Sequence, residues 1–570
     1  MSELLRIEDL HVAIGGKAVI HGLNLQLDAG ETLALVGESG CGKSTTALAV
    51  AGLLPRTCQT RGQILFHGEN LLGLGPQPLR RLQGKEIAMI FQEPLSSLNP
   101  VMTVGDQIEE TLLTHTTLDR GQRRRRITEL IDQVQLPAAS RLARRYPHEL
   151  SGGQRQRIMI AMAIACQPRL LIADEPTTAL DVTTQATILT LLDTLRDELN
   201  MGLLLITHDL GVVGERAERV AVMHDGRIVE ENSTSELFSR PQHDYSRGLL
   251  GASLRKDQPV HYRQQRLPEI RVRRREDGGL QYDLHRPATR PNPNRGATAE
   301  QTRDTPAHRT PILRVQQLSK TFHQNARRVT AVDNVSFELF QGETLGLAGQ
   351  SGCGKSTLSR LLLRLLEADH GCIELDGHDL RAARPRQLRQ LRARIQMVFQ
   401  DPYGSLNPRL RIGDMLDQLQ KLHLPLNARQ RHHEAARILD AVGLPADSLW
   451  RYPHEFSGGQ RQRIGIARAL ILKPSVVICD EAVSALDVSV QAQVLNLLVD
   501  LRDEFGLSYL FISHDLSVLR YISDRIMVMN EGRILENSRH DVLWRAPQHA
   551  YTRMLIDAIP AWQPAAALAA

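Results

Sequence analysis

The sequence has few cysteines, no long apolar run and little net charge. Its 570 residues include six cysteines and no C-x-x-C pair, so we expect a reducing, cytoplasmic compartment rather than a disulfide framework. No stretch approaches the roughly 20 apolar residues of a membrane-spanning helix, and the acidic N-terminal segment lacks the basic start of a signal peptide. Any membrane association is therefore expected to come through partner subunits. A formal charge of +5 is small for this length and neither favours nor excludes a nucleic-acid partner.

What the sequence does contain is a repeat of whole-domain length. GESGCGKST at 37–45 returns as GQSGCGKST at 349–357, and SGGQRQR, an Asp-Glu pair and a histidine follow each copy in the same order. Lys43 and Lys355 are 312 positions apart, and His208 and His514 are 306 apart. Single hydrophobic cores stop growing at about 250–300 residues. We therefore expect two tandem domains, 1–254 and 312–570.

Apolar patterns predict an α/β fold for each copy. Continuous apolar runs are typical of buried parallel strands, and alternating segments such as 23–27 and 335–339 indicate antiparallel strands with one solvated face. Amphipathic helical stretches fill the 59 positions from Gln92 to Ser151 and the 57 from Gln400 to Ser457. Together with the G-x-x-x-x-G-K-S segment of each copy, this pattern predicts a P-loop NTPase domain with a mixed sheet core, an antiparallel β subdomain and an inserted helical subdomain. The continuous runs of the first copy are Thr32–Val36, Leu170–Ala173 and Leu203–Ile206.

Residues 255–311 are expected to form a basic linker between the copies. The composition changes there to Arg, Pro, Gln and Asn with little apolar periodicity. For the basic run 271–275, a solvated tether is the favoured interpretation. The alternative is a contact of the basic run 271–275 with anionic lipid or with the acidic face of a partner. A further repeated motif, PQH-x-Tyr, stands at 241–245 and at 547–551.

The pattern G-x-x-x-x-G-K-S predicts a phosphate-binding loop in each copy. Both times it follows an apolar strand and precedes a helical stretch, which is the context that such loops require. Glycines let the backbone wrap the phosphates, amide N–H groups and the helix N-terminus face the negative charge, and the lysine reaches the β and γ oxygens. The residues predicted to bind nucleotide here are Gly37, Ser39, Gly40, Cys41, Gly42, Lys43, Ser44, Thr45, Gly349, Ser351, Gly352, Cys353, Gly354, Lys355, Ser356 and Thr357.

An aspartate and a glutamate end another buried strand of each copy, and a histidine follows the next strand. Open α/β sheets collect their ligands at the carboxyl ends of the strands. The predicted Mg²⁺ ligands in this group are Asp174 and Asp480, with the loop serines Ser44 and Ser356. The predicted catalytic residues are Glu175 and Glu481, which would polarise the attacking water, and His208 and His514, which would contact the γ-phosphate.

The order of these motifs resembles the nucleotide-binding subunits of ATP-binding cassette transporters over nearly all of both copies. The resemblance implies ATP hydrolysis, and it places the family's glutamine loop at Gln92 and Gln400, as contacts of both nucleotide and Mg²⁺. The signature segment is matched by LSGGQ and FSGGQ, and the D-loops begin at Ala179 and Ala485. The further residues that the resemblance implies for nucleotide binding are Ser151, Gly152, Gly153, Gln154, Asp181, Ser457, Gly458, Gly459, Gln460 and Asp487.

The resemblance also implies that the two domains pair face to face within the chain. Each ATP would then lie between one domain's phosphate loop and the other domain's signature segment. Lys43 would work with Ser457 and Gly459, and Lys355 would work with the equivalent residues of the first copy. Because both copies keep the lysine, aspartate, glutamate, glutamine and histidine, two hydrolytic sites are expected.

A narrower resemblance concerns the segments FQEPLSSLNP and FQDPYGSLNP and the RYPHE before each signature. These are similar to the peptide, opine and nickel importer branch of the family. That branch implies an importer's motor subunit, peripheral on the cytoplasmic face of the bacterial inner membrane. Its partners would be two transmembrane permease subunits and an extracytoplasmic substrate-binding protein, with no nucleic acid.

Several alternatives concern the cargo and the class of machine. Di- and oligopeptides are the favoured cargo, and nickel or a metal chelate and glutathione are the alternatives. A soluble tandem ATPase acting on ribosomes or DNA belongs to a different class. The Pro-rich linker and the long helical insertions disfavour it.

Two positions depart from the family pattern. The aromatic residue that commonly stacks on adenine is Phe322 in the second copy, but Ile14 stands there in the first, so weaker ATP binding is expected at the first site. Ala482 stands where the first copy has Pro176, and little effect is expected. No cysteine lies beyond Cys166 in the first domain or Cys479 in the second, so we expect no C-terminal iron–sulfur cluster.

Overall fold

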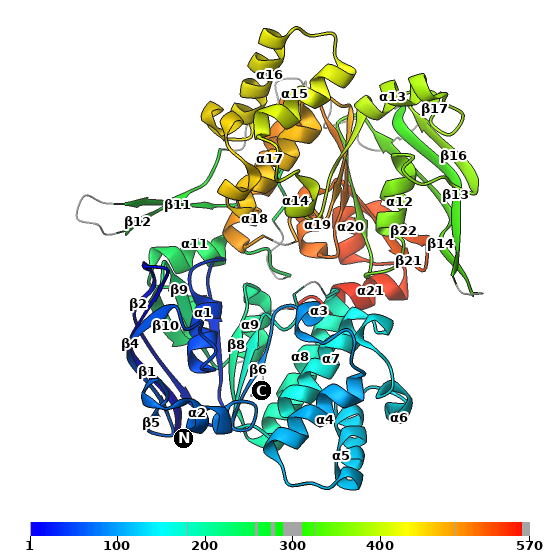
Figure 1. Ribbon diagram of the computed structural model, residues 1–570. Helices are drawn as coiled ribbons and strands as arrows, with labels where there is room; N and C mark the ends of the chain where they lie inside the picture. The colour runs from blue at the N-terminus through cyan, green and yellow to red at the C-terminus, as the bar shows by residue number, and fades with distance from the viewer. Residues whose placement is uncertain are drawn as a thin grey trace. The chain divides into compact units, whose positions relative to one another are not determined.

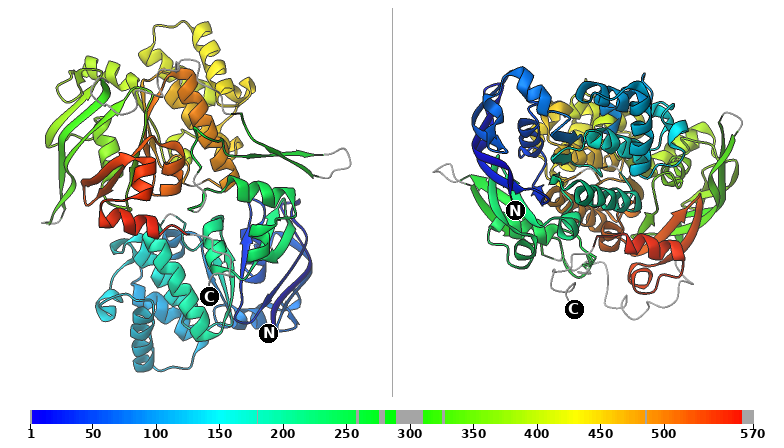
Figure 2. Two further views of the ribbon diagram at one scale, coloured as in Figure 1. Left: turned by 180° about the vertical axis from the view of Figure 1, so that it is seen from behind. Right: turned by 90° about the horizontal axis from the view of Figure 1, so that it is seen from below.

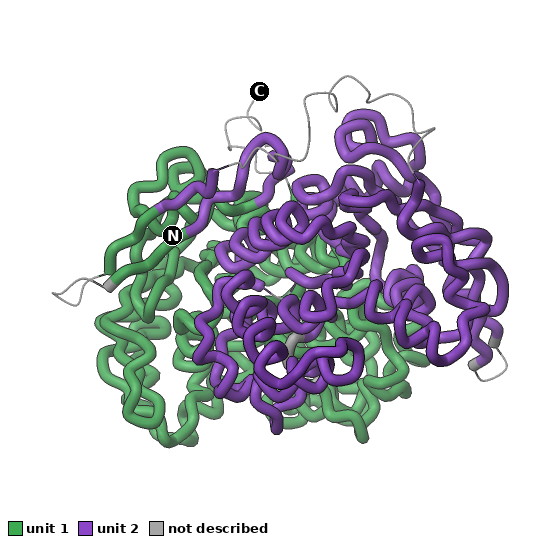
Figure 3. The backbone as a smooth tube through the Cα atoms, turned by 90° about the horizontal axis from the view of Figure 1, so that it is seen from above, with its two compact units in different colours: residues 1–253, 270–283, 560–570 green, residues 254–269, 284–559 purple. Residues whose placement is uncertain are grey.

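The structure is a computed structural model of the chain. It describes residues 2–178, 180–256, 260–274, 280–288, 310–324, 327–484 and 486–560. The chain forms two compact units, which Figure 3 shows in different colours. Unit 1 consists of residues 1–253, 270–283 and 560–570, and unit 2 of residues 254–269 and 284–559. Each unit holds one copy of the repeat, which confirms the expected tandem arrangement.

A six-stranded sheet forms the centre of unit 1 (Figure 1). Its strand order is β10-β9-β3-β8-β7-β6, and only the β9–β10 pair is antiparallel. Strands β3, β7 and β8 are buried at every position, which explains their continuous apolar sequences. These three neighbouring strands bring the ends of three motifs to one edge of the sheet. The strands are β3 (Thr32–Val36), β6 (Ile87–Ile90), β7 (Leu170–Asp174), β8 (Gly202–Ile206), β9 (Arg219–His224) and β10 (Arg227–Ser233).

A four-stranded antiparallel sheet packs against this core in unit 1. Its order is β2-β1-β4-β5, and β1 alternates between buried and exposed positions, as a strand with one solvated face does. Its inward residues, such as Ile7, Leu25 and Ile64, form one hydrophobic cluster with residues of β3 and α1. The strands are β1 (Glu3–Ile14), β2 (Lys17–Asp28), β4 (Cys58–Phe66) and β5 (Glu69–Asn70).

The helical insertion of unit 1 lies between β6 and α7, on the opposite side of the central sheet from β1 and β2 (Figure 1). Its residues share a second cluster with the sheet and with α7 and α8. Asp119 begins α5 through a capping box with Gln122. The helices of unit 1 are α1 (Lys43–Val50), η1 (Leu71–Gly73), α2 (Pro76–Leu82), α3 (Pro94–Ser97), α4 (Val104–His115), α5 (Arg120–Gln133), α6 (Ala139–Leu142), η2 (Pro147–Glu149), α7 (Gly152–Ile164), α8 (Val182–Leu199), α9 (Leu210–Arg216), α10 (Thr234–Ser239) and α11 (Asp244–Ala252).

Unit 2 repeats this architecture, as the views of Figure 2 also show. Its six-stranded sheet has the order β18-β19-β20-β15-β21-β22, and its antiparallel sheet has the order β14-β13-β16-β17. The strands are β13 (Pro311–Gln324), β14 (Arg327–Phe340), β15 (Thr344–Ala348), β16 (His370–Leu375), β17 (His378–Asp379), β18 (Ile395–Val398), β19 (Val476–Asp480), β20 (Ser508–Ile512), β21 (Arg525–Asn530) and β22 (Arg533–Arg539).

The helices of unit 2 follow the same order as those of unit 1. No helix within the described ranges combines the length and apolarity needed to cross a membrane. The helices are α12 (Lys355–Leu362), α13 (Pro385–Arg394), α14 (Pro402–Ser405), α15 (Ile412–His423), α16 (Ala428–Ala441), η5 (Ala446–Trp450), η6 (Pro453–Glu455), α17 (Gly458–Leu470), α18 (Val488–Phe505), α19 (Leu516–Ile522), α20 (His540–Arg545) and α21 (Ala550–Asp557).

Part of the segment expected to be a linker is folded into unit 2. Residues 254–269 belong to unit 2, where Arg266 is 3% exposed and donates to Asp500 at 2.7 Å. Asn496 donates to the Leu267 carbonyl at 2.8 Å. Strands β11 (Glu269–Arg274) and β12 (Leu280–His285) then form a two-stranded sheet. An ion pair and a side-chain hydrogen bond to the backbone hold this part in place.

Candidate active sites

The first phosphate loop leaves the carboxyl end of β3 and ends where α1 begins. Gly37, Gly40 and Gly42 have φ angles of 154°, 81° and 111°, which side chains rarely tolerate. A Cβ at Gly37 would lie 2.1 Å from the Met223 carbonyl oxygen, and one at Gly42 would lie 2.7 Å from Met223 Cε. Glycine is therefore required at both ends of this loop for space as well as for backbone conformation.

The Lys43 ammonium group closes the first loop. Lys43 is 5% exposed, and its Nζ donates to the carbonyl oxygens of Gly37 at 2.8 Å and Glu38 at 2.9 Å. Ser39, Gly40 and the following Ser44 are exposed on the loop surface. The positive charge is thus held inside a loop whose outer rim is open.

The second phosphate loop has the same geometry. Lys355 is also 5% exposed, and its Nζ donates to the carbonyl oxygens of Gly349 at 2.7 Å and Gln350 at 2.8 Å. The glycines Gly349, Gly352 and Gly354 have φ angles of 155°, 84° and 110°.

The loop cysteines are packed groups. Cys41 and Cys353 are each 7% exposed, and their sulfur atoms lie close to where a Cβ on the first loop glycine would be. Burial raises the pKa of the Cys353 thiol, which disfavours a thiolate. These residues therefore fill space beneath the loops.

Asp174 and Asp480 end β7 and β19 next to the loops. They are 5% and 6% exposed, and burial raises the pKa of both carboxyl groups, opposed by hydrogen bonds from Ser44 to Asp174 and from Ser359 and Ser356 to Asp480. Among the described residues, Oδ1 of each aspartate is buried without a hydrogen-bond partner. A buried carboxylate oxygen left unpaired beside a serine hydroxyl is the arrangement of a cation site.

Glu175 is held by side chains from three segments. Gln92 Nε2 donates to its Oε2 at 2.8 Å, Thr178 Oγ1 donates to the same oxygen at 2.9 Å, and His208 Nδ1 lies 3.4 Å from Oε1. Burial alone would raise the pKa of Glu175, but His208 and Thr178 lower it to about 2. The carboxylate is therefore ionised at neutral pH. Its backbone has a φ of 47°, the left-handed region.

Glu481 keeps two of these three contacts. Gln400 Nε2 donates to its Oε2 at 2.7 Å, and His514 Nδ1 lies 3.5 Å from Oε1. Ser484 stands in the place of Thr178 and donates to the Glu481 backbone carbonyl at 3.0 Å instead. Contact with His514 lowers the pKa of Glu481 against the effect of burial, and the same contact raises the pKa of His514. Glu481 also has a left-handed φ, of 50°.

Each signature segment forms the exposed start of a helix. Ser151 caps α7, and the Gln154 amide donates to Ser151 Oγ at 3.3 Å while the Ser151 amide donates to Gln154 Oε1 at 3.1 Å. Ser457 and Gln460 form the same capping box at α17. Both serines are exposed. The helix N-termini, with their positive dipole ends, therefore face away from the core of each unit.

The signature glycines allow close helix packing. A Cβ at Gly153 would lie 2.7 Å from Thr184 Cγ2, and one at Gly459 would lie 2.4 Å from Val490 Cγ1. Gly152 and Gly458 are the first residues of their helices. These contacts fix α7 against α8 and α17 against α18.

The D-loop aspartates begin the next helices. Asp181 caps α8, accepting from the Thr184 amide at 3.0 Å and from Thr183 Oγ1 at 2.6 Å. Asp487 occupies the same position before α18. Ala179 and Ala485, the first residues of the two D-loops, lie outside the described residues.

The candidate adenine contacts lie at the ends of the first hairpins. Ile14 ends β1 and is 41% exposed. Phe322 lies near the end of β13, half-buried, with Lys320 Nζ 5.8 Å from its ring centroid. An exposed isoleucine offers apolar area but no ring face.

We expect Ile14→Phe to strengthen ATP binding at the first site by about three- to tenfold, because ring stacking contributes roughly 0.5–1.5 kcal/mol. Binding is measured by nucleotide titration of the full chain with Lys355→Ala disabling the other loop. The converse change, Phe322→Ile with Lys43→Ala, should weaken the second site. Equal affinities of the two single-site chains without these changes would contradict the expected difference.

The structure brings most of the sequence-predicted residues together in each unit. Loop lysine, loop serine, aspartate, glutamate, glutamine and histidine meet at the carboxyl edge of the central sheet. The signature and D-loop residues lie instead at the starts of α7, α8, α17 and α18. Two contacts were not predicted: Thr178 on the Glu175 carboxylate and Ser359 on Asp480. The sequence does not distinguish a serine or threonine whose hydroxyl contacts a site carboxylate from any other serine or threonine.

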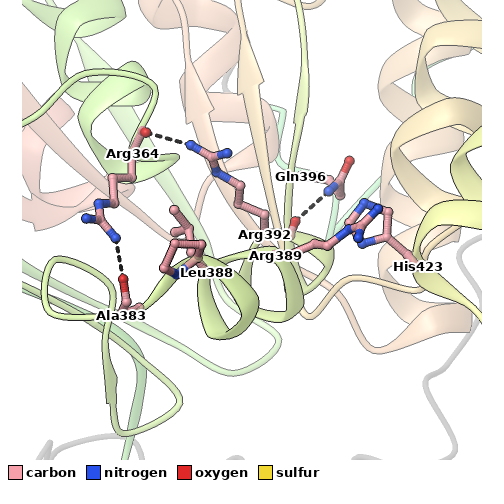
Figure 4. Close-up of a pocket in the computed structure, with 8 residues that line it drawn as sticks. Arg364, Ala383, Leu388, Arg389, Arg392, Gln396 and His423 are labelled. Carbon is pink, nitrogen blue, oxygen red and sulfur yellow. Dashed lines mark hydrogen bonds between the residues drawn. The ribbon is translucent and has the colours of Figure 1, made fainter.

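A pocket of about 440 Å³ in unit 2 lies away from these residues (Figure 4). Two of its guanidinium groups donate hydrogen bonds to backbone carbonyls. Arg364 donates to Ala383 O at 2.7 Å, and Arg392 donates to Arg364 O at 2.7 Å. These arginines therefore tie α13 to the neighbouring turns. The lining residues are Arg364, Ala383, Pro385, Leu388, Arg389, Arg392, Gln396 and His423.

The sequence is similar to those of several known proteins. The profile of the ABC transporter family matches residues 20–178 and 332–484, and that of the oligopeptide/dipeptide transporter C-terminal region matches 229–279 and 535–569. The glutathione import ATP-binding protein of Pectobacterium atrosepticum is 45% identical over 559 residues, covering 96% of this chain and 87% of that relative. The protein of the same name from Escherichia coli K12 is 44% identical over 586 residues, covering 98% and 90%. A solved dimeric bacterial ABC transporter cassette matches 40% of this chain and 99% of its own, at 25% identity and a TM-score of 0.38.

Proposed function

The chain belongs to the ATP-binding cassette transporter family as an ATPase of an import system, and we propose that it drives the uptake of glutathione and related short peptides. The observation that carries this proposal is the similarity of nearly the whole chain to two glutathione import ATP-binding proteins. The match to the oligopeptide/dipeptide transporter C-terminal region supports a peptide cargo in the wider sense. Glutathione is itself a tripeptide, so both observations point to one class of compound.

ATP and Mg²⁺ fit the residues of each unit. Lys43 and Lys355 would hold the nucleotide phosphates, and Ser44 with Asp174 and Ser356 with Asp480 would hold Mg²⁺, which neutralises developing charge on the phosphates when bound. The unpaired Oδ1 atoms of the two aspartates support this assignment. The side-chain amide nitrogens of Gln92 and Gln400 donate hydrogen bonds to the catalytic glutamates. Their amide oxygens are therefore the atoms that would face the cation.

We assign the catalytic step to Glu175 and Glu481. Each is a carboxylate kept ionised by a neighbouring histidine, and an ionised carboxylate at this position would orient and polarise the attacking water. His208 and His514 position that carboxylate from the end of the adjacent strand. Two such sets in one chain support two hydrolytic sites.

We further propose that the two units pair within the chain and act on membrane partners. Ser151 and Ser457 are the exposed N-caps of α7 and α17. The N-termini of these helices would therefore be available to bind the phosphates of the ATP at the opposite site. Two permease subunits and a substrate-binding protein would complete the importer, and the chain would work at the cytoplasmic face of the bacterial inner membrane. The family membership supports this assembly.

The cargo is tested by uptake in bacterial cells from which this chain has been deleted. We expect accumulation of labelled glutathione to fall at least tenfold and to return with the wild-type chain. A chain carrying both Glu175→Gln and Glu481→Gln is the matched control and should not restore it. Loss of labelled dipeptide uptake with normal glutathione uptake would move the assignment to general peptides. Unchanged uptake of both compounds would contradict the proposal.

A further inference from the structure

The tyrosine of each repeated PQH-x-Tyr motif lies against a phosphate loop. Tyr245 is fully buried, and its hydroxyl accepts a hydrogen bond from the Glu38 amide at 3.3 Å. Tyr551 accepts one from the Gln350 amide at 3.2 Å. Glu38 and Gln350 are the second residues of the two loops. The same contact, over more than 200 positions of sequence, therefore occurs in both units.

The loop residue that each tyrosine contacts is also contacted by the loop lysine. The Glu38 carbonyl accepts from Lys43 Nζ at 2.9 Å, while its amide donates to Tyr245. In the second loop the Gln350 carbonyl accepts from Lys355 Nζ at 2.8 Å. One residue of each loop is thus fixed on its amide side by tyrosine and on its carbonyl side by lysine.

The tyrosine is itself fixed by a chain of hydrogen bonds that starts on the central sheet. In unit 1, Glu230 on β10 accepts from the Gln242 amide at 2.8 Å and the His243 amide at 3.0 Å, and His243 Nδ1 accepts from the Tyr245 amide at 3.1 Å. These bonds set the start of α11 and with it the tyrosine.

Unit 2 contains the same chain of bonds. Glu536 on β22 accepts from the Gln548 amide at 3.1 Å and the His549 amide at 3.2 Å. His549 Nδ1 accepts from the Tyr551 amide at 3.1 Å. The glutamine and histidine of the motif therefore place the tyrosine in both units.

We propose that Tyr245 and Tyr551 are positioning residues that hold the phosphate loops in their ATP-binding shape. The inference concerns ATP binding and is independent of the transported compound. Removing a hydroxyl that holds the loop should weaken ground-state and transition-state binding equally, which raises KM and leaves kcat unchanged. A residue needed only for folding would lower the active fraction and kcat, without a change in KM.

The test uses Tyr245→Phe and Tyr551→Phe in the full chain. With Lys355→Ala disabling the second loop, Tyr245→Phe should weaken ATP binding at the first site by about three- to tenfold, the effect of one lost hydrogen bond. Tyr551→Phe should do the same at the second site in a chain carrying Lys43→Ala. Steady-state turnover of the chains with both lysines should show the raised KM at constant kcat.

Matched controls separate a local effect from a global one. Each tyrosine change is also measured at the opposite site, where affinity should not alter. Tyr521→Phe in unit 2 removes a hydroxyl that bonds Asn496 and should leave ATP affinity unchanged. Unaltered affinity in the two PQH-x-Tyr variants, equal weakening at both sites, or equal weakening in the Tyr521→Phe control would each overturn the proposal.

Discussion

A chain carrying Glu175→Gln and Glu481→Gln is expected to bind ATP but to hydrolyse it about 10²- to 10⁴-fold more slowly, the usual contribution of a general base. Glutamine preserves the size of the side chain and one acceptor oxygen for Gln92 or Gln400, but it cannot take a proton from water. Phosphate release is measured at saturating ATP, and nucleotide titration checks that affinity is retained.

The two single variants test whether both sites hydrolyse ATP. Because each glutamate is ionised and held by glutamine and histidine, either single change should lower turnover by at least half. Glu175 has an additional contact from Thr178 that Glu481 lacks. If one single variant lost all turnover and the other kept the wild-type rate, two-site hydrolysis would be wrong.

The pairing of the two units has a test in which two double variants give opposite results. If Lys43 and Ser457 share one ATP, Lys43→Ala with Ser457→Arg disables one site and leaves the other whole. Lys43→Ala with Ser151→Arg disables both sites. In the Glu175→Gln, Glu481→Gln background, where ATP is retained rather than hydrolysed, the first chain should retain a single ATP and the second none.

The reciprocal set completes this test. Lys355→Ala with Ser151→Arg should retain a single ATP, and Lys355→Ala with Ser457→Arg none. Loss of the serine cap should cost each chain about 1 kcal/mol of stability equally, so thermal midpoints serve as the folding control. The opposite result would mean that each site lies within one unit. In that case Lys43→Ala with Ser151→Arg would retain a single ATP, and Lys43→Ala with Ser457→Arg would retain none.

Much of the fold could be predicted because local and global signals agree. Residues 33–36 are all apolar, which is typical of a strand buried on both faces. The glycines that follow adopt left-handed backbone conformations that other residues rarely adopt. Asp174 and His208 follow equally clear strands. Their meeting at one edge then follows from the parallel order of β3, β8 and β7.

Contacts that depend on single polar atoms could not be predicted in the same way. Nothing in the sequence distinguishes the hydroxyl of Thr178, which reaches the Glu175 carboxylate, from that of Ser484, which turns to a backbone carbonyl. The folded part of the linker was missed for a related reason. The basic composition of this segment is typical of a solvated chain, but Arg266 is 3% exposed and donates a hydrogen bond to Asp500 on α18.

The left-handed backbone of Glu175 and Glu481 sets a limit on how far this enzyme can be stabilised. Each glutamate adopts a conformation that disfavours an L-residue with a side chain by roughly 1–2 kcal/mol, and glycine would adopt it without that strain. Substitutions chosen for thermal resistance alone would therefore tend to remove the two carboxylates on which hydrolysis depends. Directed evolution of a hardier variant has to leave these two positions untouched and find its gains elsewhere in the chain.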